Sequence, residues 1–167
     1  MTQREHASSP VIAPDTYRTT VQSDWIDYNG HMNVAYYVMV FDLAADDALA
    51  TLGLDASYRQ ATGCSVFVSE SHLVYDREIG AGASLEVHSR PLAFDDRRLL
   101  LFQEMRMGSK AAATCEVLCV HVDLASRRGR PWPDVIAAKV ATSIASREAD
   151  PWPARAGRSI TLIRPKP

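Results

Sequence analysis

The stretch from residue 34 to residue 52 constrains the fold of this 167-residue chain more than any other. It contains no glycine or proline and many good helix formers, which predicts a long helix. Gly53 follows where a helix end favours a left-handed residue. The first half of the stretch, residues 34–41, is apolar on nearly every side, and such a helix is expected to be buried. Other elements must therefore wrap around it.

Strand patterns surround this helix in the sequence. One example is the segment 84–94, where Leu85 and Val87 alternate with Glu86 and His88. Strands are predicted over residues 15–25, 64–76, 84–94, 97–107 and 111–124. A run of strands with one segregated helix predicts an α+β fold, in which a curved antiparallel sheet of about five strands wraps a long central helix. Such a sheet keeps open edges, so we expect edge pairing into a homodimer or homotetramer.

The remaining segments outline one domain. Residues 1–14 are polar and broken by prolines, and they are expected to form a disordered leader. The segment 126–133 is expected to interrupt the sheet, and residues 134–147 to form a short helix. The predicted organisation is therefore a domain over residues 15–147, followed by an irregular tail over residues 148–167.

Composition excludes several classes of function. The formal net charge of −2 argues against a broad nucleic-acid-binding face. The cysteines, Cys64, Cys115 and Cys119, form no CxxC pair and do not resemble a disulfide framework or a zinc site. No segment has the apolar length of a signal peptide core or a membrane span. We expect a soluble cytoplasmic protein with no metal, no cofactor, and no nucleic-acid or membrane partner.

The loop just before the helix carries the chemistry. It reads Asp27-Tyr28-Asn29-Gly30-His31-Met32-Asn33, and Asn33 is placed to cap the helix. A carboxylate at this position can act as a nucleophile or activate a water molecule. The free N–H groups and the dipole of the helix N-terminus favour negative charge on a carbonyl oxygen of a bound substrate. Alternatively, Asp27 is only a turn or capping residue.

This loop and the helix that follows resemble the hotdog acyl-CoA thioesterases of the 4-hydroxybenzoyl-CoA type. The resemblance extends over residues 17–133, and within the family it is closest to the betainyl-CoA thioesterases. It is carried in addition by residues 25–32, 45–49, 53–58, 97–99 and 118–123. The resemblance implies a hotdog fold and hydrolysis of a small acyl-CoA, such as betainyl-CoA in carnitine and betaine metabolism, to free acid and CoA. It also implies that Asp27 is the catalytic carboxylate and that the backbone N–H near Val34 polarises the thioester carbonyl.

Other residues near this loop are candidates for substrate contact. Asn29 and Gly30 belong to the loop itself, and Gly30 would let the substrate approach the backbone closely. His31 either orients water or the carboxylate, or only hydrogen-bonds the loop. Asn33 is better explained as the helix cap than as a ligand. Tyr37, one of several aromatic residues here, belongs either to a cage for a quaternary ammonium group or to the core.

Two further pairs of residues lie outside the loop. Glu70 and His72 are predicted to share a strand face with Val66, Val68 and Val74, where ionisable groups need partners or a cleft. Glu70 is therefore a second catalytic candidate, from the same or the neighbouring subunit, and His72 a substrate contact. The alternative is an ion pair that lines a groove.

Arg97 and Arg98 follow a turn at Asp95-Asp96. By the same resemblance they would contact the phosphates of CoA, for which arginine is suited. Ordinary surface charges are the alternative.

Two other functions stay open on the same fold. A hydroxyacyl-CoA dehydratase or hydratase would use a His with an acidic partner, as in His31 with Asp42 or His72 with Glu70. A non-catalytic acyl-CoA-binding protein would bind without turnover. Release of free thiol from acyl-CoA distinguishes hydrolysis from both.

Overall fold

The computed structural model describes residues 15–160. The predicted leader, residues 1–14, and the last part of the predicted tail, residues 161–167, lie outside the described residues. The strands are β1 (Asp15–Thr20), β2 (Cys64–Tyr75), β3 (Ser84–Phe94), β4 (Arg98–Met107), β5 (Lys110–Asp123) and β6 (Arg128–Gly129). The helices are the short 3-10 helix η1 (Ser23–Trp25), α1 (Val34–Thr51), α2 (Ala56–Thr62) and α3 (Asp134–Ala145).

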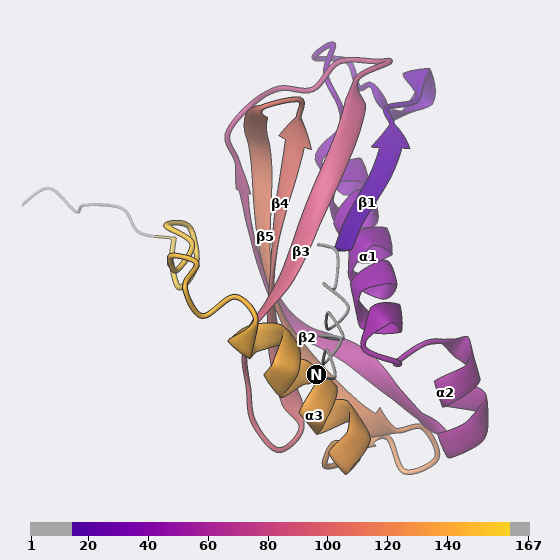
Figure 1. Cartoon of the computed structure of the whole chain (residues 1–167). Helices are drawn as coiled ribbons and strands as arrows, with labels where there is room; N and C mark the ends of the chain where they lie inside the picture. The colour runs from indigo at the N-terminus through magenta and orange to yellow at the C-terminus, as the bar shows by residue number, and fades with distance from the viewer. Residues whose placement is uncertain (1–14, 161–167) are drawn as a thin grey trace, which may run out of the picture.

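One antiparallel sheet curls around α1, in the order β1-β3-β4-β5-β2 (Figure 1). Its inner face and the buried side of α1 form the core, where Phe41, Val87, Leu99 and Met105 are each at most 2% exposed. α3 adds Ile136 to the same core, beside the C-terminal end of α1. The predicted α+β hotdog fold is confirmed.

Local signals set the bounds of α1 as predicted. The side chain of Asn33 accepts a hydrogen bond from the backbone N–H of Ala35, which satisfies one free donor at the helix start. After the helix, Gly53 adopts a left-handed φ of 89°. The predicted strands agree with β2 to β5 within one or two residues.

The prediction that the first half of α1, residues 34–41, is buried on nearly every side is wrong for a single chain. The sheet covers one side of the helix, while Val34 is 57%, Val38 49% and Leu43 40% exposed. Apolar composition shows that a surface favours burial, but it does not show whether the same chain buries it. The exposed apolar side of α1 lies beside β2, an edge strand of the sheet.

A β-bulge at Ser69 corrects a second prediction. The register of β2 with β5 shifts between Val68 and Glu70, so inward and outward positions exchange there. Val66 and Leu73 consequently both pack against the core, although simple alternation would put them on opposite faces. Glu70 and His72 lie across from Leu118 and Glu116, on the outer face of the sheet. They do not share the inner face with Val66 and Val68.

Some elements were absent from the sequence-based prediction. α2 is capped by the Asp55 side chain, which accepts from Tyr58 N–H at 2.9 Å, and it ends at Gly63 with φ 66°. The Asp55 cap and the glycine at the helix end are both standard helix-boundary signals, and the sequence contained them. β6 forms a short pairing with β5 inside the segment that was expected only to break the sheet. β1 ends at Thr20 because the chain turns into η1 instead of continuing to residue 25.

The segment after α3 covers part of the sheet's outer face. The Arg90 guanidinium donates to the carbonyl of Pro151 at 2.8 Å, and the Gly157 N–H donates to the Glu116 carboxylate at 2.7 Å. The outer face is therefore partly occupied by the chain itself, whereas the free edge of β2 is not paired within the described residues. Among residues 15–160, no helix combines the length and hydropathy needed to cross a membrane.

Candidate active site

The loop between η1 and α1 is closed by its own backbone. An isolated bridge joins Ile26 to Met32, and the N–H of Asp27 donates to the carbonyl of His31 at 3.1 Å. Gly30 takes a φ of 81°, a left-handed conformation in which a larger residue would be strained. The loop is thus a tight turn that holds Asp27 at a defined place beside the helix start.

The carboxylate of Asp27 is held by two hydrogen bonds. Its Oδ1 accepts from the backbone N–H of Asn29 at 2.8 Å, and its Oδ2 accepts from the Asn33 side-chain amide at 3.3 Å. The same Asn33 side chain uses its oxygen to cap α1. Asp27 is therefore a turn residue, and it is also an oriented carboxylate next to a helix N-terminus.

A free donor follows Asn33 directly in the chain. The Asn33 side chain accepts from Ala35, and the Asn33 carbonyl accepts from Tyr36, but within the described residues the N–H of Val34 has no hydrogen-bond partner. An unpaired N–H at the positive end of an 18-residue helix is suited to bind a carbonyl oxygen that becomes negative.

A cavity of about 200 Å³ opens between the start of α1 and the end of β2. His31, Val34 and Tyr37 line it together with Tyr75 and residues 76–78, while Asp27 lies outside the lining. The Tyr37 hydroxyl donates to the carbonyl of Arg77 at 3.1 Å, and burial raises the pKa of this phenol. Tyr37 therefore acts as a neutral wall of the cavity.

Four aromatic residues near the loop pack in two pairs, whereas Tyr28, in the loop itself, is 96% exposed. Trp25 stacks on Tyr36 at 5.3 Å between ring centroids, and Tyr37 meets Tyr75 edge to face at 5.1 Å. Both geometries are those of ordinary aromatic packing. His31 is half-buried, and its one side-chain hydrogen bond within residues 15–160 is a long one, 3.4 Å from Nδ1 to the carbonyl of Met32.

Arg97 and Arg98 lie far from this loop within one chain. Arg98 begins β4. Near the other end of β4, Met105 is in register with Ala113 of β5, and Ala113 is in register with Tyr75 of β2, which lines the cavity beside the loop. Seven residues of strand separate Arg98 from Met105, which corresponds to a distance of about 23 Å. Hydrogen bonds from the Arg98 side chain and from the Arg97 backbone hold the pKa of Asp95 well below its usual range.

The structure thus brings together seven of the predicted positions and leaves four elsewhere. Those brought together are Asp27, Asn29, Gly30, His31, Asn33, Val34 and Tyr37. Those elsewhere are Glu70 and His72 on the outer face, and Arg97 and Arg98 at the far end of the sheet.

Comparison with known proteins shows to which family the chain belongs. The pattern of the Thioesterase-like superfamily matches residues 21–140. This chain belongs to the thioesterase-like superfamily. It is 36% identical to the betainyl-CoA thioesterase of Pseudomonas aeruginosa, over 88% of this chain and 94% of that protein.

Two further relatives support this membership. An L-carnitine dehydrogenase/betainyl-CoA thioesterase of Agrobacterium fabrum is 36% identical over 87% of this chain, which spans only 30% of that longer protein. A hypothetical protein of Staphylococcus aureus, solved in complex with CoA, superposes with a TM-score of 0.83. It is 26% identical, and the match covers 89% of this chain and 95% of that one. The protein is accordingly a hotdog acyl-CoA thioesterase.

Substitutions at Asn33 should separate its two contacts in this thioesterase. Asn33→Ala removes the cap and is expected to lower the free energy of unfolding by about 1 kcal/mol. Asn33→Ser keeps a good capping oxygen but loses the amide that holds Asp27. We expect its stability to fall by less than about 0.5 kcal/mol, and its kcat to fall by about tenfold because the carboxylate is less well positioned. Urea unfolding and thiol-release kinetics measure the two effects. Equal activity in Asn33→Ser and the wild type would show that Asn33 only caps the helix.

Proposed function

We propose that this thioesterase hydrolyses a small acyl-CoA, with betainyl-CoA as the first candidate, and that Asp27 is its catalytic carboxylate. The observation that carries the proposal is the pairing of an oriented carboxylate with the unpaired N–H of Val34 at the same helix start. The choice of acyl group is supported by the identity to the Pseudomonas betainyl-CoA thioesterase.

In this mechanism the Val34 N–H binds the thioester oxygen and stabilises the negative charge that develops on it. Asp27 acts as the nucleophile, or as the general base that takes a proton from water. If Asp27 is the nucleophile, the carbon–sulfur bond breaks as an acyl anhydride forms on Asp27, the thiolate takes a proton from water, and a water molecule then hydrolyses the anhydride to release the acid. If Asp27 is the general base, water attacks the thioester carbon, the carbon–sulfur bond breaks, and the proton that Asp27 took from water passes to the thiolate of CoA. Asn33 keeps the carboxylate turned toward the helix start through its amide.

We further propose that the active form is a homodimer or a dimer of dimers, paired through β2. This 12-residue strand has a free edge within the described residues, and the exposed apolar side of α1 lies beside it. Antiparallel pairing of two β2 edges would place the Cys64 end of one copy beside the Tyr75 end of the other. Arg97 and Arg98 of the second copy would then approach the Asp27 loop of the first. This arrangement supports their predicted role in binding the CoA phosphates.

Glu70 faces outward from the sheet, so within its own chain there is no geometric reason to treat it as a catalytic group. We therefore propose that, within one chain, Asp27 carries the chemistry without Glu70. We also place the reaction in the cytoplasm. This is supported by three buried cysteines that are all free, as in a reducing compartment.

The test of the function is a thiol-release screen of the purified protein. Betainyl-CoA and short, aromatic and hydroxyacyl CoA thioesters are supplied, and free thiol is followed over time. We expect turnover, with betainyl-CoA among the best substrates. Binding of acyl-CoA without thiol release would refute hydrolysis in favour of a binding protein. Hydration of an enoyl-CoA without thiol release would favour a hydratase.

A further inference from the structure

The segment after α3 reaches the cavity beside the Asp27 loop with one charged side chain. The Arg155 guanidinium donates a hydrogen bond to the carboxylate of Asp76, and Asp76 lines this cavity. Two residues further on, the N–H of Gly157 donates to the Glu116 carboxylate at 2.7 Å, which holds the segment against the sheet. Arg155 and Asp76 are 79 positions apart in the chain, so only the tertiary structure brings them together.

Arg155 changes the balance of charge at this cavity. Besides Asp76, the lining includes Arg77 and Glu78, and neither of these makes an ion pair within residues 15–160. With its acidic side chains ionised and His31 neutral, the lining alone carries two negative charges and one positive charge. The guanidinium of Arg155 offsets the excess negative charge from outside the lining.

Negative charge is unfavourable inside this cavity. Burial, and then the nearby Tyr75 and Glu78, raise the pKa of the Tyr37 phenol, which keeps that group neutral. Val34, whose N–H has no hydrogen-bond partner within the described residues, lines the same cavity. The place proposed for the thioester oxygen is therefore surrounded by groups that oppose its negative charge.

The ion pair lies where water screens charges only in part. The Asp76 side chain is 27% exposed and that of Arg155 is 38% exposed. A CoA thioester carries negative charges on its phosphates, and hydrolysis adds one on the thioester oxygen. A carboxylate in the cavity without a partner would repel both, because like charges across a binding surface are unfavourable.

We propose that Arg155 acts through Asp76: by offsetting this carboxylate, it lets the cavity accept a negatively charged CoA thioester and the oxyanion formed from it. This inference rests on the proposed acyl-CoA site at the start of α1. Arg155 is a positioning residue in this role, because it holds and neutralises Asp76 without touching the reacting atoms. If the ion pair only tied the segment to the sheet, loss of either partner would have the same effect.

The test removes the two partners one at a time and together, in the full chain. Arg155→Gln leaves the Asp76 charge without a partner, whereas Asp76→Asn removes the charge that Arg155 offsets. Both variants break the ion pair, so they separate charge balance from attachment of the segment. Arg155→Lys keeps the positive charge. Arg158→Gln is the matched control, because it removes the same charge from the same segment and makes no ion pair within residues 15–160.

Three quantities are measured at low ionic strength, where charge effects are largest. They are kcat/KM with the best acyl-CoA of the thiol-release screen, the dissociation constant of free CoA by titration calorimetry, and the free energy of unfolding in urea. We expect Arg155→Gln to lower kcat/KM by at least about fivefold and to weaken CoA binding by about threefold. Asp76→Asn should equal or exceed the wild type, and the double variant should lie within about twofold of it. Arg155→Lys and Arg158→Gln should both resemble the wild type.

The inference is wrong if Asp76→Asn loses as much activity as Arg155→Gln, because the ion pair would then serve only to attach the segment. Wild-type activity in Arg155→Gln, or an equal loss in Arg158→Gln, would also overturn it. The double variant decides the matter if Arg155→Gln alone fails to fold: an active double variant supports the inference, and an inactive one refutes it. If no acyl-CoA is hydrolysed but CoA affinities follow the expected order, the inference stands and the proposed hydrolysis fails.

Discussion

Asp27→Asn is expected to lower kcat by about a thousandfold or more, because the amide can neither attack the thioester nor take a proton from water. The side-chain oxygen can still accept from the N–H of Asn29, so the turn should persist. We expect the free energy of unfolding to change by less than about 1 kcal/mol, since only the contact with Asn33 is lost. Thiol-release kinetics with the best substrate and urea unfolding measure the two quantities.

The matched control for this experiment is Glu70→Gln. It makes the same kind of change to a carboxylate, but on the outer face of β2. We expect kcat within about twofold of the wild type. If Glu70→Gln is inactive and Asp27→Asn is active, the assignment of the chemistry to Asp27 is wrong.

Val38→Glu is expected to break the proposed dimer and the activity together. Val38 is 49% exposed on the side of α1 that lies beside the free edge of β2. A carboxylate there would be buried without a partner at the subunit contact, close to the like charge of Asp42. We expect the dimer dissociation constant to rise by at least about a hundredfold. Analytical ultracentrifugation across a concentration series measures this change.

Activity should fall with dimer dissociation, because Arg97 and Arg98 of the second copy would no longer reach the Asp27 loop. Val135→Glu is the control: Val135 is 63% exposed, but it lies on α3, which packs against β3. We expect this variant to remain dimeric and active. A dimeric Val38→Glu protein would place the subunit contact on another surface.

Much of the fold could be predicted because its signals are local. Asn33 and Gly53 mark the ends of α1, and the alternation of residues 84–94 gives β3 its bounds, since capping and strand patterns depend only on neighbouring residues. The loop from Asp27 to Asn33 was identified in the same way as a turn before a helix start, because all of its groups lie within a few residues, whereas its catalytic role was what the family resemblance implied. The pairing of Asp27 with Asn33 depends on this short separation.

Gln103 was missed, although the pattern contained a signal for it. On β4, Leu99, Leu101 and Met105 share the inner face with Gln103, so a single polar residue interrupts an apolar row. Such a residue needs a partner from another element. The partner is the carbonyl of Phe41 on α1, 62 positions earlier in the chain, and no sequence pattern identifies it.

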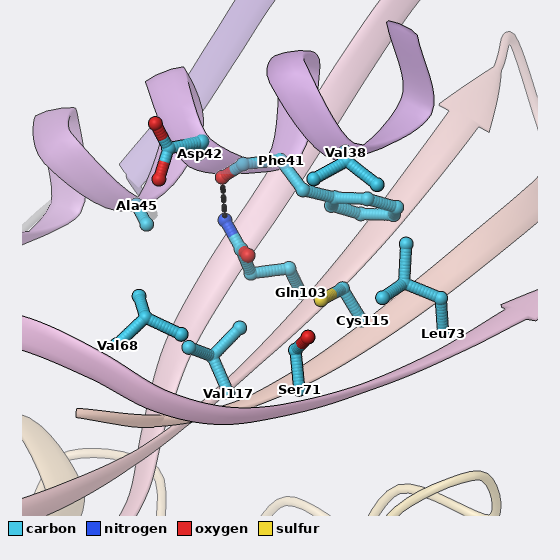
Figure 2. Close-up of a pocket in the computed structure, with 10 residues that line it drawn as sticks. All are labelled: Val38, Phe41, Asp42, Ala45, Val68, Ser71, Leu73, Gln103, Cys115 and Val117. Carbon is cyan, nitrogen blue, oxygen red and sulfur yellow. Dashed lines mark hydrogen bonds between the residues drawn. The ribbon is translucent and has the colours of Figure 1, made fainter. Parts of the chain in front are cut away.

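By itself, then, the sequence determined the helix, the long strands and the Asp27 loop, because each depends on contacts between near neighbours. Only the tertiary structure decided on which face Glu70 and His72 lie, because a bulge at Ser69 arises from pairing with β5. It also decided that one side of α1 stays open, since coverage depends on where the sheet ends. The cavity between α1 and strands β2, β4 and β5 (Figure 2) belongs with these long-range features, because it joins a helix to strands that are distant in the chain.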